Sequence, residues 1–243
     1  MPKVERAIIM AAGKGTRLKP LTESIPKPLI KVNGTRMIDS IIDALHQNGI
    51  KDIYIVVGYL KEKFYTLTKE YENITLIENP YYDTCNNISS LYVARKYLKN
   101  CIILDGDQII NNSNALATDF EHSGYNSVKI ESHTDEWLQQ TTDDLKVISC
   151  SRIGGDKGWQ LYSISRWTAA DGQRLKNLLE YEFEQKHNHQ VYWDDIAMFI
   201  YPDKFTLYVR PMSGDDVSEI DNLKELIAAD KSYNSICRRE SNA

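Results

Sequence analysis

The chain has 243 residues, of which 42% are hydrophobic and 26% are charged, and its formal net charge is −5. This composition excludes a disordered, collagen-like or low-complexity chain, and the length is sufficient for a sizeable buried core. Because an acidic chain has no general attraction for nucleic acid or anionic membranes, any phosphate chemistry requires a local cluster of basic side chains.

Short apolar segments bounded by turn residues predict strands, and apolar residues at helical spacing predict helices between them. The segments 6–12 and 52–59 are nearly continuous apolar runs, as expected for parallel strands buried on both faces. Between them, 37–47 has the apolar spacing of a helix and is followed by Asn48-Gly49, which ends it. The other expected strands are 74–79, 101–107 and 127–132, and the other expected helices are 60–71, 89–97, 169–185 and one near 222–230, with a further apolar segment at 158–167.

The alternation of strands and helices is typical of an α/β fold with a doubly wound, mostly parallel sheet and helices on both faces. No internal repeat and no linker rich in Pro, Gly or Ser divides the sequence, so we expect a single domain over residues 1–243. Within it we expect a first part over about 1–110, an inserted part over about 111–215 and a closing segment over 216–235.

No stretch approaches the ~18 apolar residues of a transmembrane helix, and the N-terminus lacks the pattern of a signal peptide. The cysteines have no CxxC spacing and are expected to be free thiols in a reducing compartment. They are Cys85, Cys101, Cys150 and Cys237. We therefore expect a cytoplasmic protein without membrane insertion.

The segment Met10–Leu29 directly follows the first expected strand and indicates phosphate binding. Its small residues, which let backbone N–H groups approach a phosphate or a base, are Ala11, Ala12, Gly13 and Gly15. Its basic residues are Lys14, Arg17, Lys19 and Lys27. The spacing matches neither common phosphate loop, because GxxxxGK[ST] is absent and Leu18 replaces the third glycine of GxGxxG.

As a whole the segment resembles the N-terminal signature of the nucleoside-triphosphate transferases that make activated sugars and alcohols, L-A-A-G-x-G-x-R-(x)n-P-K-x-L. Here Met10–Arg17 and Pro26–Leu29 match it, with methionine in place of the first leucine. The resemblance implies a Rossmann-like fold whose glycine loop, through Thr16, wraps a nucleotide. It also implies that Arg17 binds the triphosphate and the leaving pyrophosphate, and that Lys27 lies by the α-phosphate; Lys14 and Lys19 are equally compatible with a solvated surface.

Carboxylates follow the expected strand 101–107, and ligands of open α/β sheets lie beyond the carboxyl ends of strands. Asp105 and Asp107 there, and Asp221 in the motif Ser218–Asn222, could supply oxygen ligands for Mg²⁺. The resemblance implies a Mg²⁺ site formed by Asp107 and Asp221, with Asp105 near the nucleotide. The alternatives are a helix N-cap for Asp221 and a capping role for Asp105.

Later blocks at 79–95, 136–137, 192–195 and 218–226 resemble bacterial CTP:phosphocholine cytidylyltransferases and, equally, their relatives that activate 2-aminoethylphosphonate. The likeness extends over about residues 5–230. It implies CTP as the nucleotide, with Tyr59, Asn87 and Ser90 as nucleoside contacts or as structural residues.

The implied acceptor carries a phosphate or phosphonate and a cationic head. Aromatic faces bind a quaternary ammonium, whereas a primary ammonium also needs acceptor oxygens, and the sequence offers both. The candidate acceptor residues are Glu136, Trp137, Tyr192, Trp193 and Asp194. Lys157, in a glycine-rich turn, is the expected contact of the acceptor phosphate. The products would be CDP-choline or CMP-aminoethylphosphonate, with pyrophosphate.

Two other functions remain open. A sugar-1-phosphate nucleotidyltransferase is disfavoured by the block 192–195, and a nucleotide-binding regulator without activity is disfavoured by the intact catalytic residues. The expected partners are CTP and a small phosphorus-containing amine, not nucleic acid. A homodimer is compatible with the sequence.

Overall fold

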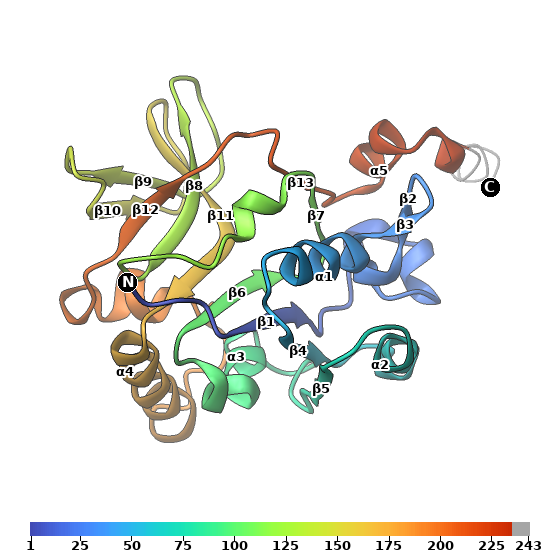
Figure 1. Cartoon of the computed structure of the whole chain (residues 1–243), viewed down its shortest axis with the longest axis horizontal. Helices are drawn as coiled ribbons and strands as arrows, with labels where there is room; N and C mark the ends of the chain where they lie inside the picture. The colour runs from blue at the N-terminus through green and yellow to red at the C-terminus, as the bar shows by residue number, and fades with distance from the viewer. Residues whose placement is uncertain (235–243) are drawn as a thin grey trace.

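The computed structural model describes residues 1–234, and their longest strands form one nine-stranded mixed sheet (Figure 1). Four parallel strands form one half, in the order β5 (Ile74–Glu78), β4 (Asp52–Val57), β1 (Arg6–Ala11) and β6 (Cys101–Asp105). In the other half β11 (Gly158–Trp167) runs antiparallel to β6 and also pairs with β8 (Gly124–Ile130) and β9 (Leu138–Thr141). The remaining strands are β10 (Val147–Ser151) on β9, β12 (Tyr208–Pro211) on β8, and the small pairs β2 (Lys31–Val32) with β3 (Thr35–Arg36) and β7 (Gln108–Ile110) with β13 (Val217–Glu219).

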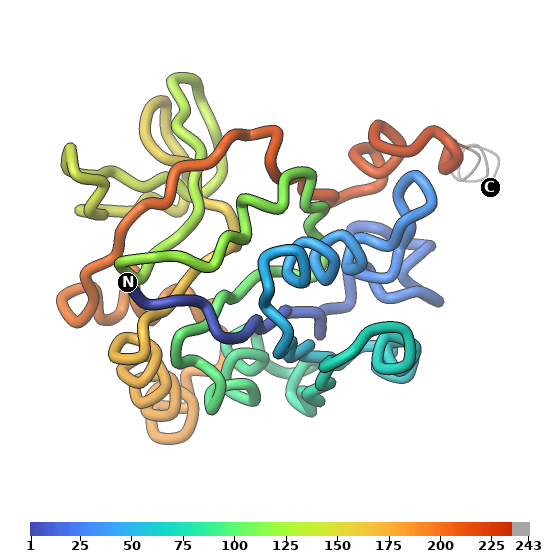
Figure 2. The backbone as a smooth tube through the Cα atoms, in the orientation of Figure 1, coloured from blue at the N-terminus to red at the C-terminus, as the bar shows by residue number. Residues whose placement is uncertain are grey.

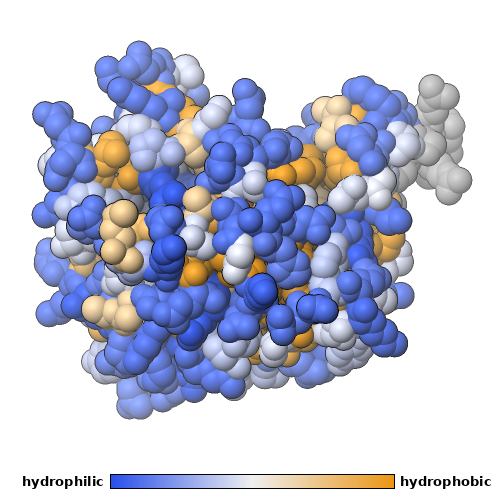
Figure 3. All heavy atoms as spheres, in the orientation of Figure 1, coloured by the Kyte–Doolittle hydropathy of each residue, from blue (hydrophilic) through white to orange (hydrophobic). Residues whose placement is uncertain are grey.

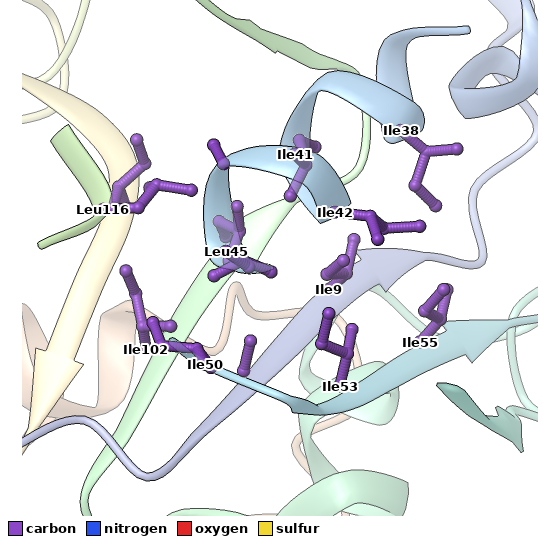
Figure 4. Close-up of a cluster of buried hydrophobic side chains, with 14 of the residues drawn as sticks. Ile9, Ile38, Ile41, Ile42, Leu45, Ile50, Ile53, Ile55, Ile102 and Leu116 are labelled. Carbon is purple, nitrogen blue, oxygen red and sulfur yellow. The ribbon is translucent and has the colours of Figure 1, made fainter. Parts of the chain in front are cut away.

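Helices cover both faces of the parallel half. Alternate residues of β1 enter different cores: Ile9 packs with α1 (Met37–Gln47), whereas Ile8 packs with α3 (Ile88–Ala94) and α4 (Ala169–Glu180). Figure 4 shows Ile38, Ile41, Ile42 and Leu45 of α1 next to the isoleucines of β1, β4 and β6. Each such buried side chain contributes about 1.5–3 kcal/mol of transfer free energy. The predicted doubly wound α/β fold is thereby confirmed.

The differences from the predicted elements are local. The segment 60–71 is mainly a 3₁₀ helix, Lys61–Thr66, followed by the short α2 (Leu67–Glu70). The predicted strand 127–132 begins earlier, at Gly124, and the helix 169–185 changes to a π-helical turn at Tyr181–Gln185. Several short strands of the antiparallel half were not predicted, because strands of four or five residues such as β9 and β10 carry no long apolar run. Cys237 lies outside the described residues.

The chain after β12 crosses the molecule to α5 (Leu223–Ala229), on the side of β2 and β3 (Figure 2). Ile220 and Leu226 pack there with Leu18 and Ile30, which flank the catalytic candidate Lys27. This small core holds the segment around Asp221 against the glycine loop. The face shown in Figure 3 is mostly hydrophilic, and no helix among residues 1–234 has the length and apolarity to cross a membrane.

Gly172 of α4 is a close-approach position that can be tested by substitution. A Cβ atom there would lie 1.9 Å from the carbonyl oxygen of Leu98. Although alanine is the better helix former by about 1 kcal/mol, we expect Gly172→Ala to lower the free energy of unfolding by about 1–3 kcal/mol because of this overlap. Urea denaturation measures the change, and Asn177→Ala on the exposed face of the same helix is the control. A more stable Gly172→Ala protein would contradict the packing.

Candidate functional site

The candidate site lies where β1 and β6, neighbouring parallel strands, end side by side. The chain order of the strands reverses between them, which is where open α/β sheets bind ligands. Two adjoining cavities open there, with volumes of about 520 Å³ and 300 Å³. Both are lined by Arg17, Asn87, Asp105, Asp107 and Asp221.

The glycine loop lines the larger cavity, which is called the nucleotide cavity after the predicted role of this loop, together with Ser90 and Lys27. The loop residues on its wall are Ala11, Ala12, Gly13, Gly15 and Thr16. Gly15 has a φ of +61°, and a Cβ atom there would lie 2.9 Å from Cβ of Lys27, so both backbone conformation and space favour glycine. Thr22 Oγ1 donates to the Gly15 carbonyl (3.0 Å), and the Tyr59 hydroxyl donates to the Thr22 carbonyl (2.8 Å). Tyr59 therefore supports the loop from outside the cavity.

Lys27 lies between two carboxylates at the junction of the cavities. Its Nζ is 2.5 Å from Oδ2 of Asp107 and 2.9 Å from Oδ1 of Asp221, while Nη2 of Arg17 is 3.0 Å from the same Asp221 oxygen. Burial alone would lower the pKa of Lys27, but the charges and hydrogen bonds of the two carboxylates outweigh it, so that the pKa is raised. Lys27 therefore stays charged and held in position, with its side chain only 9% exposed.

Asp105 faces both cavities. Burial, followed by the charges of Asp107 and Asp194, raises its pKa well above the usual range, against a hydrogen bond with Ser163. A neutral carboxyl group can donate a hydrogen bond to a ligand and does not repel a phosphate.

The smaller cavity, which is called the acceptor cavity after the predicted role of its residues, combines aromatic and acidic side chains. The rings of Trp137 and Tyr192 meet edge to face, with centroids 5.9 Å apart. Around them lie Glu136, Asp194 and Glu219. Such a wall suits a small cationic group, which aromatic faces and carboxylates both attract.

Glu219 and Ser163 line the acceptor cavity but were not singled out from the sequence. Burial among the cavity walls raises the pKa of Glu219 to about 7, although part of the side chain still reaches solvent. The hydrogen bond that Gln108 Nε2 donates to Oε1 (2.8 Å) lowers the pKa and only partly offsets this effect. The i, i+2 spacing of Glu219 and Asp221 was the available signal, since alternate residues of an extended segment share a side. Ser163, inside a long strand, carried no such signal.

Besides Tyr59, the structure leaves three predicted site residues outside both cavities. Lys14 points away and pairs with Asp83 on the surface. Trp193 is buried, with its ring centroid 6.0 Å from that of Trp167, and it meets the site only through its backbone N–H, which donates to Oδ1 of Asn87 (2.9 Å).

The third of these residues is Lys157, which directly precedes β11. Its Nζ lies 3.6 Å from a carboxylate oxygen of Glu131. It lines a separate cavity beside Lys129. The residues of β11 that do reach the acceptor cavity are Leu161 and Ser163. Lys157 precedes this strand, and its place in the glycine-rich turn does not bring it to the cavity.

Comparisons with known proteins identify the family of this chain. The family model for nucleotidyl transferases matches residues 6–135. The chain is 36% identical to a 2-aminoethylphosphonate cytidylyltransferase of Lancefieldella rimae over 93% of this chain and 92% of that protein, and 37% identical to a choline-phosphate cytidylyltransferase of Haemophilus influenzae over 90% and 93%.

The solved CTP:phosphocholine cytidylyltransferase of Streptococcus pneumoniae superposes with a TM-score of 0.87 and 33% identity, covering 93% of this chain and 98% of that one. The match therefore extends over nearly the whole of both chains. On the family model, the full-length relatives and the shared structure, this chain belongs to the nucleotidyl transferase family.

Proposed function

We propose that the chain transfers a cytidylyl group from CTP to a small phosphate or phosphonate that carries an amine, with release of pyrophosphate. The observation that carries this proposal is the position of Lys27, Asp107 and Asp221 at the junction of the two cavities. One cavity has the glycine loop for a triphosphate, and the other has a wall for a cationic head. The names of the full-length relatives support the same pair of substrates.

In the proposed reaction an acceptor oxygen attacks the α-phosphorus of CTP. The new P–O bond forms as the bond between the α-phosphorus and the oxygen that bridges it to the β-phosphate breaks, and that oxygen departs as part of pyrophosphate. Lys27 and Arg17 place two positive charges beside the reacting phosphates, which lowers the repulsion between two anionic substrates. No covalent intermediate with the protein is needed.

The site fits a magnesium ion. The positive charges of Arg17 and Lys27 only balance Asp107 and Asp221, so that a bound triphosphate would add negative charge that a divalent ion can offset. Asp107 and Asp221 supply two hard oxygen ligands, although residues 1–234 contain no group of three or more acidic, His or Cys side chains placed to hold a metal alone. When bound, the ion would neutralise phosphate charge.

Asn87 and Ser90 are the proposed nucleoside contacts, because both line the nucleotide cavity at the start of α3. Ser90 Oγ already accepts a hydrogen bond from Asn79 Nδ2 (3.0 Å), which fixes its direction. We further propose one functional unit in which the first part binds CTP, the inserted part binds the acceptor and the closing segment supplies Asp221. Its proposed cellular location is the cytoplasm.

Pyrophosphate release with each nucleoside triphosphate tests the function. The acceptors are phosphocholine, 2-aminoethylphosphonate, phosphoethanolamine and glucose-1-phosphate, each with Mg²⁺. We expect CTP with an amine-bearing acceptor to exceed every other combination by at least about tenfold in kcat/KM, because only these acceptors place a cation in the acceptor cavity. Faster turnover with glucose-1-phosphate would contradict the proposed acceptor, and CTP binding without any turnover would contradict catalysis.

The pH dependence of acceptor binding tests the role of Asp194. Burial raises the pKa of this carboxyl to about 7, against a hydrogen bond that the Tyr125 hydroxyl donates to Oδ1 (2.9 Å). Below this pKa the group is neutral and above it the group is a carboxylate, so its attraction for a cationic head increases as pH rises through about 7. The acceptor itself also titrates, so the measurement is the ratio of acceptor KM in Asp194→Asn to that in the unmodified protein. We expect the ratio to increase from about pH 6 to about pH 8; a constant ratio would remove Asp194 from cation binding.

A further inference from the structure

Arg152 directly follows the edge strand β10 and lines neither of the two cavities. Its guanidinium group nevertheless contacts both segments that form the aromatic wall of the acceptor cavity. Cζ lies 3.9 Å from the ring centroid of Phe199 and 5.8 Å from that of Trp137, and Nη2 lies 2.5 Å from Oδ1 of Asp195. The residue thus joins the segment 192–199 to the start of β9.

Asp195 connects Arg152 to Tyr192. The carboxylate is buried, with its side chain 5% exposed, and its second oxygen, Oδ2, accepts the backbone N–H of Tyr192 (3.0 Å). A buried carboxylate requires a compensating charge, and Arg152 is its cationic partner. The ion pair therefore fixes the backbone from which the half-exposed Tyr192 ring projects into the cavity.

The guanidinium group also lies near the ring of Trp137. The Trp137 ring packs edge to face against Phe199, at 5.3 Å, and against Tyr192, at 5.9 Å, while Arg152 lies near both Trp137 and Phe199. A planar guanidinium group can pair with a carboxylate and stack on an aromatic ring at the same time, which a lysine ammonium cannot do as well. Since Asp195 is already paired, its neighbour Asp194 is the carboxylate of this segment that lines the acceptor cavity.

We propose that Arg152 is a positioning residue that holds Trp137 and Tyr192 at the angle required to bind the cationic head of the acceptor. This inference rests on the proposed function, because it assumes that the wall receives a cation. Arg152 does not touch the substrate, so its loss weakens acceptor binding and leaves the nucleotide cavity intact.

The kinetic test uses Arg152→Gln, Arg152→Lys and Asp195→Asn. For Arg152→Gln and Asp195→Asn we expect the acceptor KM to rise about tenfold, with kcat and the CTP KM within about twofold of the unmodified protein. Arg152→Lys should give an intermediate KM, because it keeps the charge and loses the planar contact. An unchanged acceptor KM, or an equal loss in both substrates, would overturn the proposal.

Arg174→Gln is the matched control. Arg174 also pairs with an aspartate, Asp171, and lies over an aromatic ring, Phe205, at 5.7 Å, with a side chain about as exposed as that of Arg152. It lies on α4, outside both cavities. We expect no change in either KM; a rise in the acceptor KM equal to that of Arg152→Gln would mean that the effect is not specific to the wall and would overturn the proposal.

A measurement without substrates separates this inference from the proposed function. The near-ultraviolet circular dichroism difference between a protein and its Trp137→Phe derivative reports the fixed environment of the Trp137 ring. We expect this difference spectrum to weaken in Arg152→Gln and to persist in Arg174→Gln. If the unmodified protein transferred no cytidylyl group to any acceptor, the proposed function would fail, whereas an unchanged difference spectrum in Arg152→Gln would by itself overturn the positioning role.

Discussion

Replacing Lys27 with methionine is expected to lower kcat by about 100- to 1000-fold, which is the usual cost of removing one preorganised charge from a transition state that gains negative charge. Its ammonium group lies between Asp107 and Asp221, at the junction of the two cavities. Methionine keeps most of the side-chain volume but leaves the two carboxylates without their shared cation. The measurement is pyrophosphate release at saturating CTP and acceptor.

Lys19→Met is the control for Lys27→Met. Lys19 belongs to the same segment, but its side chain is 60% exposed and lies 3.9 Å from Glu23. We expect Lys19→Met to have the same kcat as the unmodified protein, because an exposed ion pair of this kind contributes little to stability. Equal losses in the two variants, or unmodified kcat in Lys27→Met, would remove Lys27 from the reacting centre.

Asp107→Asn and Asp221→Asn are each expected to lower kcat by about 100-fold or more and to raise the concentration of Mg²⁺ needed for half-maximal activity. The reason is that each substitution removes one of the two carboxylates proposed to bind the ion, whose charge stabilisation is worth several kcal/mol. Binding of Mn²⁺, followed by its electron paramagnetic resonance signal in the presence of CTP, gives a readout that does not depend on turnover.

The exposed Asp203→Asn serves as the control for loss of a carboxylate, since it lies in a surface turn outside both cavities. It should bind Mn²⁺ as the unmodified protein does. If Asp107→Asn and Asp221→Asn also did so, the two aspartates would not be metal ligands.

The parallel half of the fold was predictable because its signals are local and strong. Residues of β1 and β4 are apolar on both sides, and the helix at 37–47 begins and ends where its apolar spacing and Asn48-Gly49 predict. The convergence of the glycine loop with Asp107 followed from sheet geometry, because carboxyl ends of neighbouring parallel strands meet at one edge. The position of Asp221 beside them came from the resemblance rather than from spacing.

The acceptor cavity was harder to predict because tertiary packing decides which side of a residue faces the ligand. Trp193 and Tyr192 are adjacent in sequence, yet the larger ring enters the core and the smaller one lines the cavity. Lys157 directly precedes β11 and Ser163 lies within it, but of the two only Ser163 lines the cavity. The reason is that Ser163 is next to the part of β11 that pairs with β6, from Ile164 to Trp167, whereas Lys157 is at the far end of the strand. Composition and local pattern do not contain this information.

The most direct test is a crystal structure with a non-hydrolysable CTP analogue and Mn²⁺, in which the anomalous signal locates the ion. We expect the triphosphate along residues 11–17 with Lys27 at the α-phosphate, and the ion coordinated by Asp107 and Asp221. A nucleotide bound away from the glycine loop, or an ion without an aspartate ligand, would contradict the proposed function.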